Sequence, residues 1–553
     1  MHATGTSGCP GAPRRTLVVL CLLLTFPAWA RTRQTVAIPM RDGATLAGDV
    51  YLPGSGSWPV VLIQTPYNKN LFAAALTAGD DPLLGSPDYA FVVTDWRGYF
   101  GSAAAASPGY DRGLDGYDTV EWIAAQAFSN GAVGTWGASA LGVVQLQTAA
   151  KHPPHLLAAV PEVAHMRDSY ELYYPGGVYA RNKNTFVATV FGGDALVRAH
   201  PTDDSAWRAV EASGIHGADI DIPMLFVSGW YDHETDVTLA AAAEIQAEGG
   251  PGARGRQRVL VGPWSHSHLD EADQNALTYP AAAGEAARRA LVFFDLYLRG
   301  EATGADAWPF ITYFRINDSV WRHAPAWPPP ATTGTLRFAG DGTLGTGAPD
   351  GPAEVSWASD PRSPVPTLFG AILIQTTGST QGPGDLTPAE LRADVRAFTT
   401  PPLAAPLRIE GRATATVWVA CSAVDVDVAV RLTDVDEAGR SWLLVDAIRR
   451  ASLSASLSSR QLLSPGVPVR VAVDLPSVAV TIPPGHRLRA DLAASNYDRF
   501  DVNLQDGSSL SDAPGGTPTP ATVTLLLDRD HPATLDLPVV RDQVVRRRLT
   551  RAP

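Results

Sequence analysis

The sequence predicts an α/β domain with a mostly parallel sheet, followed by an all-β domain. Between residues 34 and 310, short apolar runs bounded by turn residues alternate with helical patterns, as in buried parallel strands joined by helices. After the proline-rich stretch 325–330 the helical patterns nearly vanish, and alternating or β-branched segments follow at short intervals. With 553 residues, the chain is long enough for two or three domains.

The elements of the α/β part follow one another in order. Residues 34–53 indicate two strands around the Asp42-Gly43 turn, which is a common hairpin signal. The expected buried strands are 59–65, 91–95, 132–136, 156–160, 224–228 and 259–262. The expected helices are 117–127, 138–152 and 285–298.

Two other regions depart from this alternation. Between about 165 and 220 the chain is rich in Tyr, Arg and Asp, and we expect short helices and loops inserted over the sheet edge, where they shape a pocket. Toward the C-terminus, strand-like segments separated by turn residues favour a β-sandwich or jelly roll. These segments are 413–419, 424–432, 467–475 and 488–493.

The first thirty residues have the pattern of an export signal. Arg14 and Arg15 precede the apolar run 17–26, and Ala28-Trp29-Ala30 matches a small-x-small cleavage site. The run is too short to span a bilayer comfortably, and an uncleaved anchor is the alternative. We therefore expect a secreted or periplasmic protein without stable membrane insertion after cleavage.

The composition excludes some classes of protein. Hydrophobic residues make up 45% of the chain and charged residues 18%, which fits a folded protein. The net charge of −13 makes nucleic acid a poor partner, because phosphate binding needs clustered Lys and Arg. Cleavage after Ala30 would leave Cys421 as the single cysteine, so no internal disulfide is expected.

Chemistry is first indicated by the segment Gly137-Ala138-Ser139-Ala140-Leu141-Gly142, which joins a predicted strand to a predicted helix. A serine becomes a useful nucleophile when a sharp turn exposes it and a base removes its proton. The helix N-terminus behind it adds partial positive charge where an oxyanion forms. The usual pattern is G-x-S-x-G, and here the second glycine comes one position late.

An acid and a histidine follow in the order that such a serine requires. The strand 224–228 runs into Asp232, and the strand 259–262 runs into His266. The alternative roles are a turn or cap residue for Asp232 and a surface histidine for His266. Their places at successive strand ends favour a Ser139-His266-Asp232 catalytic triad.

With these motifs in place, the chain resembles the cocaine esterase-type (CocE/NonD) acyl hydrolases of the X-Pro dipeptidyl-peptidase-like (peptidase S15) α/β-hydrolase family. The similarity covers nearly the whole chain after the signal. The stretches that carry it are Asp42-Gly43, Gln64-Thr65-Pro66-Tyr67, Asp95-Trp96-Arg97-Gly98, Asp115-Gly116-Tyr117-Asp118, 137–142, 229–232, 262–268, 293–300, Trp321 and Pro328.

The resemblance implies a domain division and further site residues. It implies a signal peptide at 1–30, an α/β-hydrolase domain at 31–164 and 221–310, a helical cap at 165–220, and a C-terminal jelly roll at 311–553. It also implies an oxyanion hole from the Tyr67 hydroxyl and the Ala140 backbone N–H. A packed aromatic is the alternative for Tyr67. The residue after the nucleophile is often Tyr in this family, so Ala140 loses any side-chain contact with the substrate.

Two residues are weaker candidates for substrate binding, Glu234 and Tyr174. In the related α-amino acid ester hydrolases, a glutamate placed like Glu234 belongs to a carboxylate cluster for the substrate ammonium. Here Thr235 stands where that motif has a second acid, so a solvated surface side chain is the favoured interpretation of Glu234.

The resemblance therefore predicts a serine hydrolase that cleaves acyl esters, or amides, of small molecules or short peptides, with no metal and no cofactor. X-Pro dipeptidyl aminopeptidase and α-amino acid ester hydrolase activities are the alternatives within the family. A carbohydrate- or surface-binding protein with an inactive α/β part is the alternative outside enzymes. A homodimer is left open.

Overall fold

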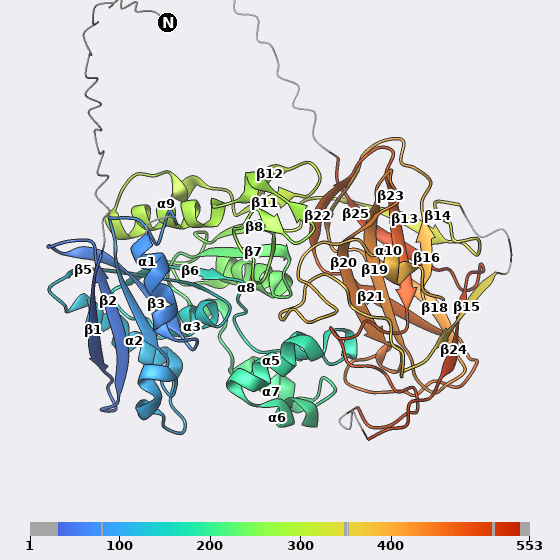
Figure 1. The fold of residues 1–553 in the computed structure, drawn as a ribbon, viewed down its shortest axis with the longest axis horizontal. Coiled ribbons are helices and arrows are strands. Elements are labelled where there is room, and N and C mark those ends of the chain that lie inside the picture. Colours follow the sequence, from blue (N-terminus) through green and yellow to red (C-terminus); the bar gives the residue numbers. More distant parts are fainter. Residues whose placement is uncertain (1–30, 79–80, 348–350, 352, 511–514, 542–553) are drawn as a thin grey trace, which may run out of the picture.

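The computed structural model describes residues 31–541, apart from 79–80, 348–350, 352 and 511–514. It has two domains with a group of helices between them (Figure 1). The expected export signal, residues 1–30, lies outside the described residues. No helix in the described part of the chain is long and apolar enough to cross a membrane.

The first domain is built on a ten-stranded sheet with the order β1-β2-β4-β3-β5-β6-β7-β8-β11-β12. The pairings from β4 to β11 are parallel, and the outer pairings β1–β2, β2–β4 and β11–β12 are antiparallel. The strands are β1 Thr32–Pro39, β2 Thr45–Leu52, β3 Trp58–Thr65, β4 Ala90–Asp95, β5 Ser129–Ala138, β6 Leu156–Glu162, β7 Leu225–Tyr231, β8 Arg258–Ser265, β11 Ile311–Arg315 and β12 Val320–Ala324. Every strand expected in this domain is confirmed.

Helices cover both faces of this sheet. Successive side chains of a strand point to opposite faces of the sheet, and two adjacent residues of β5 contact helices on the two faces. A Cβ at Gly134 would lie 2.7 Å from the ring of Phe294 in α9, whereas the next residue, Thr135, donates a hydrogen bond to Gln145 in α3. The helices of this domain are α1 Ala73–Ala78, α2 Arg112–Ala124, α3 Ala140–Ala149, α8 Thr235–Glu248 and α9 Glu285–Arg299. Burial on both faces explains why the central strands are continuous apolar runs.

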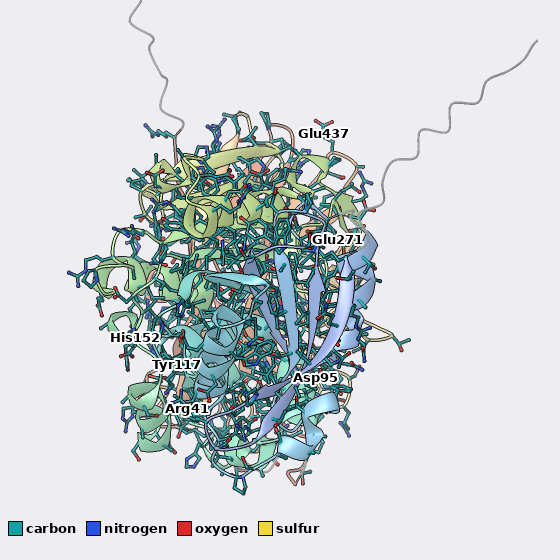
Figure 2. All side chains as sticks on the ribbon, turned by 90° about the vertical axis from the view of Figure 1, so that its left-hand side faces the viewer. Arg41, Asp95, Tyr117, His152, Glu271 and Glu437 are labelled. Atoms are coloured by element: carbon teal, nitrogen blue, oxygen red, sulfur yellow. The ribbon has the colours of Figure 1, made fainter. Side chains whose placement is uncertain are left out.

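The turn between β1 and β2 is anchored on α2 through Arg41. Its guanidinium donates to Asp118 at 2.7 Å and lies 5.0 Å from the ring centre of Tyr117 (Figure 2). Gly43 in the turn has a φ of 84°, which glycine adopts without a steric penalty. The hairpin expected from Asp42-Gly43 is therefore confirmed.

Short helices fill the connection between β6 and β7, where an insertion was expected. They lie between the two domains (Figure 1). Four buried aromatic side chains form a small core within the insertion: Tyr170, Tyr174, Tyr179 and Trp207. The helices are α4 Tyr170–Tyr173, α5 Arg181–Phe191, α6 Asp194–Ala199 and α7 Ser205–Ser213.

The second domain consists of two antiparallel sheets. One has nine strands, with β14-β13-β25-β18-β24-β15 as its main path, and the other has the order β16-β23-β19-β20. The strands are β13 Thr332–Phe338, β14 Leu344–Gly345, β15 Glu354–Ser359, β16 Arg396–Thr399, β17 Leu407–Gly411, β18 Thr414–Cys421, β19 Asp427–Val435, β20 Ser441–Arg450, β21 Val469–Asp474, β22 Val478–Ile482, β23 Arg487–Ala493, β24 Ala521–Leu526 and β25 Thr534–Val539. An α/β domain followed by an all-β domain is thus confirmed, while the jelly-roll topology stays a prediction.

The boundary between the domains differs from the expected position at 310/311. Strands β11 and β12 extend the first sheet, because Ile311 to Tyr313 pair in parallel with Val259 to Val261 of β8. The backbone of β8 would otherwise leave an open edge in the sheet. The break in the fold therefore comes after β12, next to the proline-rich stretch 325–330.

Candidate active site

Ser139 occupies a strained turn between β5 and α3. Its backbone has φ 60° and ψ −124°, and a non-glycine residue at positive φ costs on the order of 1–3 kcal/mol. Its N–H donates to the carbonyl oxygen of Glu162 at 2.9 Å, which ties the turn to the end of β6. The side chain is half-buried at the N-terminus of α3, as the nucleophile-elbow prediction requires.

Two glycines of the motif allow the close packing around this turn. A Cβ at Gly137 would lie 2.7 Å from the Cβ of Leu141. At Gly142 it would lie 2.7 Å from the Cβ of Ala164 and 2.8 Å from the carbonyl oxygen of Glu162. The glycine that comes one position late in the sequence is therefore needed where α3 contacts the chain just after β6.

Asp232 and His266 form a hydrogen-bonded pair at the ends of β7 and β8. The distance from His266 Nδ1 to Asp232 Oδ2 is 2.6 Å, and the Asp232 side chain is completely buried. Burial lowers the pKa of His266, but the Asp232 carboxylate outweighs it, so the net shift is upward. Burial would likewise raise the pKa of Asp232, and the neighbouring imidazoles of His266 and His233 hold it below its usual value. This pairing is what a catalytic acid and base need.

The contact between Ser139 and His266, the expected nucleophile and base, is not made. Among the described residues, no hydrogen bond joins Ser139 to His266. His233 lines the pocket around Ser139, and its ring packs against that of His266 with 4.9 Å between centroids. Catalytic hydrogen bonds are often long without substrate and tighten in the complex. The structure therefore brings Asp232 and His266 together, and proton transfer from Ser139 requires a movement that closes the gap to His266.

The pocket around Ser139 has a volume of about 210 Å³. Tyr67 and Ala140 line it beside Ser139, and the second domain contributes Leu373. Burial raises the pKa of the Tyr67 hydroxyl, while its contact with the Ser139 side chain acts in the opposite direction. Ala140 begins α3, where the first N–H groups have no acceptor within the helix. A hydroxyl and an N–H donor thus both lie beside Ser139, where a developing oxyanion needs them.

Four of the ionisable side chains that line this pocket form a cluster, which we call the charged quartet: Glu234, His165, Asp168 and Lys183. His165 lies between the two acids, with Nδ1 at 3.1 Å from Glu234 and Nε2 at 3.6 Å from Asp168. The Lys183 ammonium donates to the carbonyl oxygen of Leu172 at 2.6 Å. Glu234 is only 6% exposed, so its interpretation as a solvated surface side chain was wrong. The reason is that the insertion folds over it.

The quartet is electrically balanced near neutral pH. Burial lowers the pKa of His165, but the two carboxylates outweigh it and raise the value to about 9. Burial lowers the pKa of Lys183 to about 8. Burial acts to raise the pKa of Glu234 and of Asp168, but His165 holds both below their usual range. Two cations therefore face two anions at pH 7.

The second weak candidate, Tyr174, lies elsewhere. Its ring stacks on Tyr170 at 5.3 Å, and its hydroxyl donates to the carbonyl oxygen of Val197 at 3.1 Å. It does not line the pocket around Ser139 among the described residues, so the expectation of a substrate contact was wrong. The aromatic core of the insertion takes this side chain. Conversely, the sequence did not indicate His165, Lys183 or Leu373, because no local pattern shows that these residues meet Ser139 in the fold.

Several known proteins are similar to this chain over most of its length. The model of the X-Pro dipeptidyl-peptidase family S15 matches residues 42–209, and that of the X-Pro dipeptidyl-peptidase C-terminal non-catalytic domain matches residues 295–536. Cocaine esterase from Rhodococcus sp. is 29% identical over 580 residues, which cover 92% of this chain and 98% of that protein.

Two solved structures share the fold over nearly the whole chain. An aminopeptidase from the marine sediment archaeon Thaumarchaeota archaeon superposes with a TM-score of 0.80 at 22% identity, covering 97% of this chain and 99% of that one. An α-amino acid ester hydrolase gives a TM-score of 0.76 at 23% identity, covering 96% and 100%. At these identities the superpositions establish the fold.

Proposed function

Because the chain belongs to the cocaine esterase-type branch of the X-Pro dipeptidyl-peptidase (S15) family and is a serine hydrolase, we propose that it cleaves esters of uncharged carboxylic acids through an acyl-enzyme on Ser139. The observation that carries the choice of substrate is the balanced charged quartet in the pocket wall. The remaining parts of the site supply the chemistry.

The proposed reaction has two halves. The Ser139 oxygen attacks the ester carbonyl while His266 takes its proton, and Asp232 orients the imidazole and stabilises its charged form. The Tyr67 hydroxyl and the Ala140 N–H stabilise the oxyanion. The intermediate collapses, the alcohol leaves with the proton from His266, and Ser139 carries the acyl group. Water then attacks by the same route and releases the acid.

The charged quartet argues against a substrate with a free amino group near the scissile bond. An ammonium group that leaves water needs an uncompensated carboxylate as partner. Glu234 and Asp168 are the acids closest to this role, but His165 contacts both of them and Lys183 adds a second positive charge. An uncharged acyl group meets no such conflict, because the same wall also presents the apolar side chains of Phe186 and Leu373.

The test compares substrates that differ only in the amino group. We expect p-nitrophenyl 3-phenylpropanoate to be cleaved with at least tenfold higher kcat/KM than the p-nitrophenyl ester of phenylalanine, and Ala-Pro-p-nitroanilide to be cleaved hardly at all. A preference for either amino-bearing substrate would overturn the proposal. A fluorophosphonate probe should label the protein and fail to label Ser139→Ala. Retention on polysaccharide without labelling would favour a binding protein.

A further inference from the structure

The proposed reaction leaves one buried imidazole next to Asp232 without a role. The His233 side chain is 11% exposed, and its Nδ1 is buried with no hydrogen-bond partner. That atom lies 3.8 Å from Asp232 Oδ1, while Nε2 lies 3.5 Å from Glu234 Oε1. An Nε2–H directed at Glu234 leaves a lone pair on Nδ1, so a nitrogen acceptor faces a carboxylate oxygen across a gap.

The geometry points to a metal-binding site: we propose that Asp232, His233 and His266 bind a divalent transition-metal ion, zinc being the probe, and that the ion inhibits the enzyme. One ligand atom from each residue lies within 4.8 Å of the others. Tetrahedral zinc with bonds of about 2.0–2.1 Å places its ligand atoms about 3.3 Å apart. The 3.8 Å between His233 and Asp232 is close to that spacing, and His266, whose ligand atom lies within 4.8 Å of the other two, completes the set after a local rearrangement.

The ligand types suit such an ion. Imidazole and carboxylate bind zinc and copper, whereas calcium and magnesium prefer sites made of oxygen atoms. A fourth position remains for water, as in zinc sites with three protein ligands. Glu234 supports the arrangement from behind, because its N–H donates to Asp232 Oδ1 at 2.6 Å and its carboxylate lies next to His233 Nε2.

A second cavity lies beside these ligands. It has a volume of about 280 Å³ and lies where the sheet, the insertion and the second domain meet. Asp232, His233 and the half-exposed Arg412 are among the residues that line it. Because the Asp232 side chain is completely buried, an ion that enters this cavity reaches the carboxylate only after a local movement of the lining.

The inhibitory effect rests on the proposed function. A metal bound to His266 occupies a lone pair of the imidazole, which then no longer takes up the Ser139 proton or keeps its bond to Asp232. The ion is an inhibitor in this scheme and supplies no step of the hydrolysis. Inhibition should therefore be reversible, and removal of the ion by EDTA should restore the full rate.

The experiment titrates zinc chloride against hydrolysis of p-nitrophenyl 3-phenylpropanoate by the full chain. His233→Phe should raise the zinc concentration for half-inhibition at least tenfold over that of the wild type, with inhibition of each protein expressed as a fraction of its own uninhibited rate. His233→Asn serves the same purpose if the first variant does not fold. His268→Gln is the matched control, because His268 is an exposed histidine two residues from His266. Equal inhibition of the wild type and the His233 variants, or relief by His268→Gln, would overturn the proposal.

A binding measurement separates this inference from the proposed function. Ser139→Ala should bind zinc in a calorimetric titration with the wild-type Kd, and cobalt should give the visible absorption of a tetrahedral site that His233→Phe lacks. Zinc binding by a protein without esterase activity would leave the metal site standing and remove the proposed reaction. Esterase activity without zinc binding would leave the proposed reaction standing and remove the metal site.

Discussion

The two sides of the Ser139 pocket are built by different physical means, and two glutamates show the difference. Glu162 ends β6 beneath the elbow, where burial and the negative charge of Asp270 raise its pKa to about 8. Glu234 follows β7 and lines the pocket, where His165 outweighs burial and keeps its pKa low. The turn at Ser139 thus depends on backbone geometry, with a carboxyl beside it that stays protonated at neutral pH, whereas the insertion side depends on charge pairs. We expect changes on the first side to affect the rate and changes on the second to affect substrate choice.

The largest effect should come from Ser139→Ala. Removal of a nucleophile from a triad lowers kcat by about 10⁴–10⁶-fold, because the acyl-enzyme no longer forms. The measurement is the hydrolysis rate of p-nitrophenyl 3-phenylpropanoate, with circular dichroism as the control for folding. A folded variant that keeps more than a hundredth of the activity would place the nucleophile elsewhere.

Tyr67→Phe should have the next largest effect. It removes one oxyanion donor and keeps the ring, so we expect kcat to fall by about 10²–10³-fold with little change in KM. A donor that acts only in the transition state has this signature. Tyr110→Phe is a matched control, since Tyr110 is half-buried and does not line the pocket among the described residues. A change in KM alone would assign Tyr67 to packing against the substrate.

Lys183→Met should change specificity by a smaller factor. It leaves Glu234 and Asp168 opposite one protonated histidine, so the wall becomes net negative and better suited to an ammonium group. We expect the ratio of kcat/KM for the phenylalanine ester to that for the 3-phenylpropanoate ester to rise about five- to tenfold. Lys151→Met, at a partly exposed lysine paired with Asp111, should leave the ratio unchanged. An unchanged ratio in Lys183→Met would show that the quartet does not set the choice.

The same contrast explains what the sequence predicted well. The elbow, Asp232 and His266 follow from local patterns, because a strand end, a tight turn and a helix start each have a signature over a few residues. The charged quartet has no such local signature, because Glu234 pairs with residues about 50 to 70 positions earlier in the chain. Without these partners, an isolated acid is interpreted as a solvated surface residue. Tyr174 failed for a related reason, because the sequence does not show which aromatic of the insertion faces the substrate. The domain boundary came too early because β11 and β12 extend the first sheet, in which β11 pairs with β8.

The smallest expected effect is on stability, from Glu162→Gln. The folded protein keeps a proton on Glu162 up to about pH 8, whereas the unfolded chain releases it near pH 4.5. Between these values the folded state binds more protons, so the free energy of unfolding falls as the pH rises. Glutamine does not titrate and still accepts the hydrogen bond that Trp136 donates to Glu162 at 3.1 Å. We therefore expect nearly equal Tm values near pH 4.5 and an advantage of the variant in the free energy of unfolding that grows by about 1.4 kcal/mol per pH unit up to pH 8. Glu354→Gln, at an exposed glutamate of β15, should show no such trend. A gain that is independent of pH, or that is largest in acid, would mean that the elbow side tolerates a charge as well as the insertion side does.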